Sequence, residues 1–185
     1  MTYTPSPNEI LSEQIAKNAG LDWHQLPLPY MAAVAATLRA RGIGVDSYHA
    51  NPDDPRSGAV ILDHALPGDS ELALIWSADG AWDYVQCRGP HDEGYAHAPL
   101  GYVATLALPE QIADAVAELT GLPYQPDPAA LARIAPWQAP ADYDPEPELT
   151  EPDDASPELD RGLAAYVTHP GYLDHAGARP SHDED

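Results

Sequence analysis

A short link, Ala78-Asp79-Gly80, joins two segments in which large apolar residues recur at every second position. This spacing is typical of β-strands, and a three-residue link with glycine in the left-handed conformation is typical of a hairpin. The two segments are therefore predicted to pair antiparallel. In that register Trp76 faces Trp82, and Leu74 faces Tyr84. One face of the hairpin then carries the side chains of Leu72, Leu74, Trp76, Trp82 and Tyr84.

Strands and helices around this hairpin occupy separate parts of the sequence. Further strands are predicted over residues 45–49, 59–63 and 100–106. Helices that begin with a proline in the first turn and end at a glycine are predicted over residues 7–19, 29–41 and 109–119. Because the helices precede and follow the strands, the fold class is predicted as α+β. It would be an antiparallel meander of four or five strands, with the helices before and after it packed on one face.

The first of these helices has a capping box at Ser6 and Glu9, which predicts its starting point. Its predicted apolar face is formed by Ile10, Leu11, Ile15 and Ala19.

The chain is predicted to have four regions. They are an N-terminal helix in residues 1–25, an α+β domain in 26–124, a short helix or linker in 125–140, and a tail in 141–185. Asp127 and Pro128 would begin the short helix of the third region, which would extend through Ile134. The tail is acidic and rich in proline, so it is predicted to be disordered.

One apolar island interrupts that tail. Ser156-Pro157-Glu158 predicts the start of a short helix over residues 157–168, and His169-Pro170-Gly171 predicts its end. One face of this helix would carry Leu159, Leu163, Tyr166 and Val167. A helix this short is marginal alone in water. Three alternatives are therefore open: the helix docks on its own domain, it docks on a partner, or it does not form.

The charge of the chain restricts its partners. Its 30 acidic and 8 basic residues give a formal charge of −22, and 13 of the acidic residues lie in the tail. This charge argues against direct binding to nucleic acids or to anionic membranes, since both need basic surfaces. It favours a protein partner with a basic or apolar patch.

The N-terminus and the cysteine content favour the cytoplasm. Residues 1–9 lack the basic and apolar regions of a secretory signal, and the chain has no apolar run long enough to span a membrane. Cys87 is the only cysteine, which excludes an intramolecular disulfide and a cysteine-based zinc site.

The best candidate for chemistry is the segment from His91 to His97, in which two carboxylates lie between two histidines. These side chains are suited to a divalent metal, although the spacing matches no closed zinc pattern, and the alternative is an exposed polar loop. Asp53 and Asp54 are better interpreted as solvated turn residues, and Cys87 as a structural thiol. Nucleotide-binding and hydrolase motifs are absent, so no cofactor is predicted.

The hairpin aromatics Trp76, Trp82 and Tyr84 have two interpretations. They would form either a platform that binds a ligand or peptide, or a core covered by the apolar faces of the helices.

Several of these segments together resemble a known family. The segments are Leu28-Pro29-Tyr30-Met31, Leu66-Pro67-Gly68, the hairpin with Gly80-Ala81-Trp82, and Leu108-Pro109. Over about residues 28–122 the chain resembles an uncharacterised domain of unknown function that is common in actinobacterial proteins. The resemblance implies no activity, no cofactor and no catalytic residue.

The function expected from the sequence is that of a non-enzymatic protein-binding or regulatory module. Its binding residues would be Trp76, Trp82 and Tyr84 in the hairpin, together with Leu159, Leu163, Tyr166 and Val167 in the tail. One alternative is an acidic mimic of nucleic acid that inhibits a DNA-binding protein through the tail. The other is a metal-dependent enzyme or sensor that uses His91 and His97.

Overall fold

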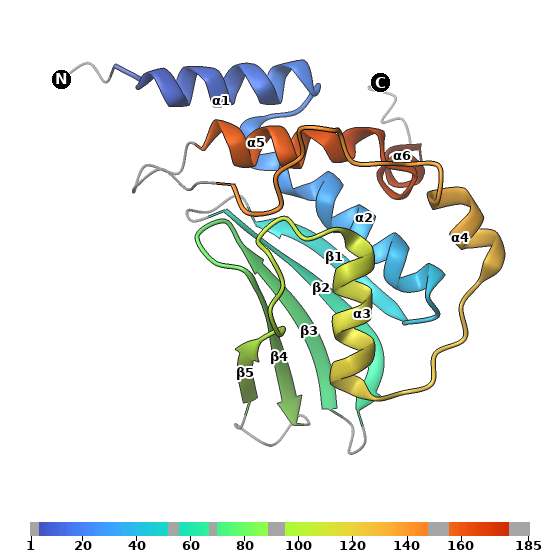
Figure 1. Cartoon of the computed structure of the whole chain (residues 1–185). Helices are drawn as coiled ribbons and strands as arrows, with labels where there is room; N and C mark the ends of the chain where they lie inside the picture. Colours follow the sequence, from blue (N-terminus) through green and yellow to red (C-terminus); the bar gives the residue numbers. More distant parts are fainter. Residues whose placement is uncertain (1–3, 52–55, 67–69, 89–94, 148–155, 178–185) are drawn as a thin grey trace, which may run out of the picture.

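A five-stranded antiparallel sheet forms the centre of the protein in a computed structural model that describes residues 4–51, 56–66, 70–88, 95–147 and 156–177. The strands lie side by side in chain order (Figure 1). They are β1 (Val45–Asn51), β2 (Ser57–Leu66), β3 (Ser70–Ser77), β4 (Trp82–Arg88) and β5 (Tyr95–Pro99). The predicted α+β meander is confirmed.

The register of the central hairpin is the predicted one. Trp76 pairs with Trp82, and Leu74 pairs with Tyr84. The left-handed conformation expected for Gly80 is wrong, because Gly80 is not among the glycines with positive φ. The link instead closes through the amide of Gly80, which donates to the Ser77 carbonyl at 3.3 Å.

The last strand lies earlier in the chain than predicted. The strand expected over residues 100–106 is wrong, since β5 spans Tyr95–Pro99 and the chain then turns at Gly101, where φ is 67°. The apolar residues of that segment, Leu100 and Leu106, are buried as parts of a loop that crosses the core. The Leu100 amide still donates to the Trp82 carbonyl of β4 at 2.7 Å, whereas the Thr105 carbonyl accepts from the Trp76 indole at 2.7 Å, so the loop leaves the sheet after its first residue.

Helices precede and follow the sheet in the chain. They are α1 (Pro7–Asn18), the 3-10 helix η1 (Trp23–Gln25), α2 (Pro27–Ala40), α3 (Pro109–Thr120), α4 (Pro128–Ile134), α5 (Pro157–Ala164), the 3-10 helix η2 (Ala165–Thr168) and α6 (Pro170–Gly177). The core lies between the sheet and α2, whose residues are nearly all buried, with Ile112 and Val116 of α3 beside it.

The first helix starts as predicted but buries a different face. The Ser6 hydroxyl accepts from the Glu9 amide at 3.2 Å, which completes the capping box. Ile10 and Leu11 are 56% and 42% exposed, whereas Ser12 and Ala16 are buried. The predicted apolar face is therefore wrong in part. Helix α1 lies against α5 (Figure 1), and small side chains allow two helices to approach closely.

The apolar island of the tail docks on its own domain. Leu159, Leu163 and Tyr166 are almost completely buried, and Val167 is half-buried. Ser156 accepts from the Leu159 amide at 3.3 Å, as its predicted role requires. The helical run ends at Thr168 as predicted, although its last turn is the 3-10 helix η2, and the helix α6 that begins at Pro170 was not predicted. Residues 141–147 and 156–177 of the predicted tail thus take part in the fold.

A buried ion pair joins this segment to the sheet. Arg56 and Asp160, whose side chains are 1% and 0% exposed, meet at 2.6 Å. The other Asp160 oxygen accepts from the Trp23 indole at 2.9 Å, and the Arg56 guanidinium lies 4.1 Å from the centre of the Trp23 ring. Three segments far apart in the sequence therefore meet at one charged contact: η1, the residue that precedes β2, and α5.

Candidate functional site

The hairpin aromatics expected to bind a ligand or partner belong mainly to the core. Trp76 and Trp82 are fully buried, and the Trp82 indole lies 3.1 Å from the Tyr30 hydroxyl. The Tyr30 hydroxyl itself donates to the Ala107 carbonyl at 2.7 Å. Tyr84 is half-buried at the margin of the same cluster. Of the two interpretations of Trp76 and Trp82, the structure has the core and not an accessible platform.

The apolar tail residues are occupied in the same way. The Tyr166 ring lies 4.8 Å from that of Tyr30 and 4.7 Å from that of Trp137, measured between ring centres. Burial raises the pKa of Tyr166 far above the usual range, so its hydroxyl stays protonated and bonds to the Tyr143 hydroxyl at 2.9 Å. This face of α5 and η2 is therefore turned inward.

Of the two histidines in the candidate metal site, only His97 lies within the described residues. His97 is exposed and lies 2.8 Å from a carboxylate oxygen of Asp83. His91, like Asp53 and Asp54, lies outside the described residues. Within the described part of the chain, no three His, Cys, Asp or Glu side chains are grouped as metal ligands. The use of His91 and His97 for a metal stays a prediction.

None of the helices in the described part of the chain is both long enough and apolar enough to cross a membrane.

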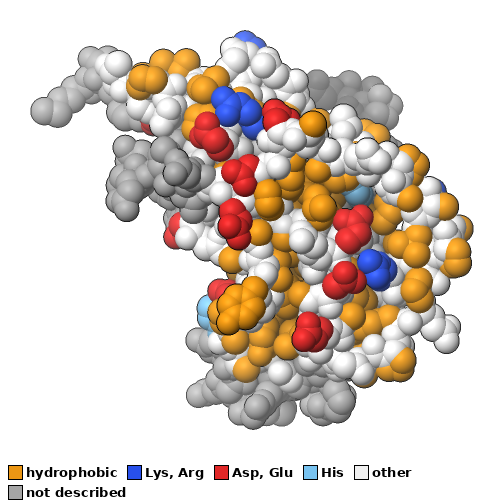
Figure 2. All heavy atoms as spheres, in the orientation of Figure 1, with side chains coloured by type: hydrophobic (Ala, Val, Ile, Leu, Met, Phe, Trp, Pro, Cys, Tyr) orange, Lys and Arg blue, Asp and Glu red, His pale blue; other side chains and the backbone are white. Residues whose placement is uncertain are grey.

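Acidic side chains form a band over one face of the molecule. Glu110, Asp114 and Glu118 are exposed and follow one another at intervals of four residues along α3. Asp144 and Glu146 lie near the start of α3, because the Pro145 carbonyl accepts from the Leu106 amide at 2.9 Å. Figure 2 shows acidic side chains along this face, over α3. We call these five carboxylates the acidic band.

Only one member of the band is neutralised by a described basic residue. Asp114 lies 3.3 Å from Arg41, and both side chains are substantially exposed. Glu110, Glu118, Asp144 and Glu146 form no ion pair with the described part of the chain. The band therefore presents several uncompensated negative charges to solvent.

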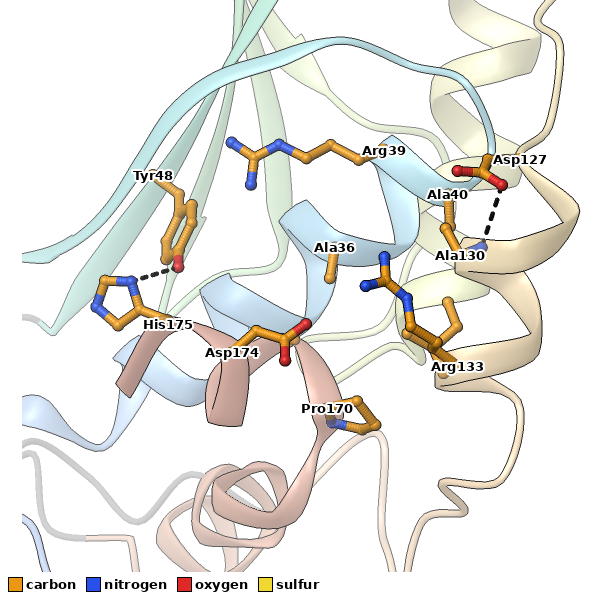
Figure 3. A pocket seen from close by; sticks show the side chains of 12 residues that line it. Ala36, Arg39, Ala40, Tyr48, Asp127, Ala130, Arg133, Pro170, Asp174 and His175 are labelled. Carbon is orange, nitrogen blue, oxygen red and sulfur yellow. Dashed lines mark hydrogen bonds between the residues drawn. The ribbon is translucent and has the colours of Figure 1, made fainter. Parts of the chain in front are cut away.

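A hollow of about 490 Å³ lies on another part of the surface, between α2, β1, α4 and α6 (Figure 3). Its lining combines small apolar residues with charged ones. We call it the α2–α6 hollow; it is lined by Ala36, Arg39, Ala40, Tyr48, Asp127, Ala130, Arg133, Ile134, Pro170, Gly171, Asp174 and His175.

Local hydrogen bonds hold one side of this hollow. Arg39 donates to the Val45 carbonyl at 2.9 Å, and its guanidinium lies 6.0 Å from the centre of the Tyr48 ring. The Tyr48 hydroxyl lies 2.8 Å from Nδ1 of His175. Burial raises the pKa of Tyr48, an effect that Arg39 partly opposes, so Tyr48 is a protonated hydroxyl at neutral pH. These contacts connect α2 and β1 of the domain to α6.

Sequence reasoning missed the hollow completely. Arg39 and Arg133 are ordinary exposed positions of predicted helices, and Asp174 and His175 follow the point where the tail helix was predicted to end. The only signal available was the scarcity of basic residues, 8 in the chain, which makes each arginine without a local acidic partner worth examining.

Comparisons with known proteins place the sheet in a family. No curated protein and no solved structure matches the chain. Residues 30–118 match a family model, and this range contains the whole sheet with most of α2 and α3. The resemblance found over about residues 28–122 is thereby confirmed as an uncharacterised family. This part of the chain belongs to DUF6292, a family of unknown function.

Proposed function

We propose that the protein is a non-enzymatic binding module, and that a basic surface of a protein partner docks on the acidic band. The observation that carries this proposal is the row Glu110, Asp114 and Glu118, which is continued by Asp144 and Glu146 on one exposed face. Binding of this kind needs complementary charge and no reacting group.

The contrast with the buried acid Asp160 supports the proposal. Asp160 is fully paired with Arg56 and Trp23, as a carboxylate inside a protein must be. Most of the band, by comparison, faces water without a basic partner, and like charges side by side repel one another. A basic partner would relieve that repulsion, and the net charge of −22 would attract it from a distance.

Two matched triple variants test this proposal. Glu110→Gln, Asp114→Asn and Glu118→Gln together remove three charges from α3. Asp46→Asn, Asp63→Asn and Glu71→Gln remove three exposed charges from β1, β2 and β3. Affinity for an arginine-rich peptide would be measured by calorimetry at low and moderate salt, followed by affinity capture of cellular proteins.

The band variant should bind the peptide roughly tenfold more weakly at low salt, whereas the control should lose much less. Proteins captured by the wild type and the control should be absent from the band variant. Equal loss in both variants would mean that only total charge matters, and it would refute a defined docking face.

The nucleic-acid mimic remains a second proposal, motivated by the acidic tail. A chain ending at residue 140 is not a fair test of it, because such a chain lacks α5 and its buried contacts. Neutralising Glu148, Glu151, Asp153 and Asp154 in the full chain is the appropriate variant. Unchanged inhibition of a DNA-binding protein by this variant would remove these carboxylates from the explanation.

The metal-dependent alternative keeps its own test, the metal content of the natively purified protein. A bound metal that is lost on changing His91 and His97 would support it, and metal-free protein would end it.

A further inference from the structure

Two arginines without a described acidic partner line the α2–α6 hollow of this acidic protein. Among the basic side chains that the structure describes, Arg41, Arg56 and Arg161 each pair with a carboxylate. Arg39 and Arg133 have no carboxylate within ion-pair distance in the described part of the chain, and both line the hollow. The similarly unpaired Lys17 lies on α1, outside the hollow.

An acidic side chain without a partner faces the same space. Asp174 on α6 forms no ion pair or hydrogen bond with the described residues, although it lines the hollow together with Arg133. Figure 3 shows Arg133 reaching from α4 and Asp174 from α6 toward the region beside Ala36. The other lining carboxylate, Asp127, is occupied, because it accepts from the amides of Ala129 and Ala130 at 2.9 and 3.2 Å.

The floor of the hollow is made of small side chains. Ala36 and Ala40 of α2 and Ala130 of α4 line it, and Gly171 of α6 lies so close to α2 that an added Cβ would be 2.5 Å from Cβ of Ala36. This close contact holds α6 at a set distance from α2. The space above the floor has room for a short aliphatic chain with charged groups at its ends.

We propose that the α2–α6 hollow binds an amino acid with an acidic side chain. Arg133 binds the α-carboxylate, Asp174 binds the α-ammonium group, and Arg39 binds the side-chain carboxylate. The three unpaired protein charges are positive, negative and positive, and such a ligand carries the three opposite charges. Arginine is suited to this role because its planar fork binds a carboxylate through two parallel hydrogen bonds.

Each protein charge has a separate effect on ligand choice. A dicarboxylate without an amine would place its charge near Asp174 with no compensation, so it should bind more weakly. An amino acid with an uncharged side chain would leave Arg39 without a carboxylate. These two losses can be measured separately with ligands of nearly equal size.

Calorimetry on the full chain with L-glutamate, glutarate and L-glutamine is the experiment. L-Glutamate should bind roughly tenfold more tightly than either of the others, which is the range expected for one unmet charged contact. Arg133→Gln should weaken L-glutamate binding by about the same factor. Arg39→Gln should bring the affinity for L-glutamate down to that for L-glutamine.

Asp174→Asn provides the sharpest variant, because it should change affinity in both directions. L-Glutamate should bind more weakly to it, since the ammonium group loses its partner. Glutarate should bind more tightly, since a repelling charge is gone. If Asp174 had a purely structural role, Asp174→Asn would weaken the binding of L-glutamate and of glutarate alike.

Arg161→Gln is the matched control, since Arg161 is exposed on α5 and outside the hollow. It should leave all three affinities unchanged, as should the triple variant of the acidic band. Thermal unfolding without ligand checks that each variant is folded. Absence of binding up to tens of millimolar, equal affinity for the three ligands, or an unchanged Arg133→Gln variant would each overturn the proposal.

Discussion

Helices α5 and α6 are neighbours in the chain, yet they contact the rest of the protein in different ways. Helix α5 buries Leu159, Asp160 and Leu163 almost completely. In helix α6, Leu173 is 54% exposed, and Asp174 and His175 line the α2–α6 hollow. Helix α5 completes the core, whereas helix α6 borders the α2–α6 hollow.

The difference shows how one segment can serve both stability and binding. Groups such as Asp160 that are fully enclosed must be fully paired, so they contribute to the folding energy and are inaccessible to a ligand. Groups such as Asp174 that stay in contact with water can remain unpaired until a ligand arrives. Substitutions in α5 should therefore change stability, whereas exposed substitutions in α6 should change binding.

The largest effect is expected for Asp160→Asn. This change removes the Asp160 charge that the buried Arg56 meets at 2.6 Å, which should lower the free energy of unfolding by about 3–5 kcal/mol. Urea unfolding at neutral pH measures it. Glu158→Gln is the control on the same helix, because its pair with Arg161 is exposed and should be worth less than about 1 kcal/mol. Similar losses in both variants would contradict the distinction between buried and exposed pairs.

A change at the contact between α6 and α2 should affect both properties. In Gly171→Ala the new methyl group would lie 2.5 Å from Cβ of Ala36 and 3.0 Å from the Ala32 carbonyl oxygen. Helix α6 must then move away from α2, at a cost of roughly 1–3 kcal/mol in unfolding free energy.

The same variant should alter ligand binding in the hollow. Gly80→Ala is a matched control, since the nearest atom to its added Cβ is 3.8 Å away. Unchanged stability and unchanged binding in Gly171→Ala would show that the two helices are loosely joined.

His169, which lies between η2 and α6, should make the stability of the protein depend on pH. Burial lowers the pKa of His169 from 6.5 to about 4 in the folded state. As the pH falls below 6.5, the unfolded chain takes up a proton on this ring while the folded chain resists, so stability decreases between about pH 6.5 and 4.

The expected loss attributable to His169 over that interval is roughly 1–3 kcal/mol. Because many carboxylates also titrate near the lower limit, the relevant quantity is the difference between the wild type and His169→Gln. Nδ1 of His169 accepts from the Gly171 amide at 3.1 Å, and glutamine stays neutral while offering a carbonyl oxygen as an acceptor. Identical pH profiles for the two proteins would exclude His169 as a source of acid sensitivity.

The smallest effect is expected for Tyr166→Phe. The ring and its contacts with Tyr30 and Trp137 are kept, and only the hydrogen bond to the Tyr143 hydroxyl is lost. Thermal unfolding should show a loss of about 1 kcal/mol. Tyr172→Phe is the control, because the Tyr172 hydroxyl has no hydrogen bond within the described residues. A loss of several kcal/mol in Tyr166→Phe would mean that the aromatic cluster depends on this hydroxyl.

Local signals in the sequence predicted the elements of the fold well. The pairing of Trp76 with Trp82 follows from a short link and a period of two, and the starts of α1 and α4 follow from their caps at Ser6 and Asp127. In these cases the determining residues are neighbours in the chain. The stretch between Leu100 and Leu106 misled the prediction, because its apolar residues are buried by tertiary contacts and not by a sheet.

The contacts between distant segments could not be predicted in this way. The partner of Arg56 is 104 residues away, and nothing near either residue indicates the pair. The hollow has the same origin, since Arg39, Arg133 and Asp174 come from three helices whose relative placement depends on packing. Exposed single charges look alike in a sequence whether they line a hollow or an ordinary surface.

The docking of α5 has a consequence for the choice of domain borders when a part of this protein is expressed. The stretch recognised by similarity ends at residue 118, whereas the segment that pairs with Arg56 through α5 and covers Tyr30 through η2 begins at Pro157. The stretch shared with the family and the part of the chain that folds together therefore have different borders. A fragment of this chain trimmed to residues 30–118 would expose the Tyr30 ring to water and would lack the Asp160 carboxylate that meets Arg56. Such a fragment would need an equivalent cover for this surface, whether from a second copy or from another protein.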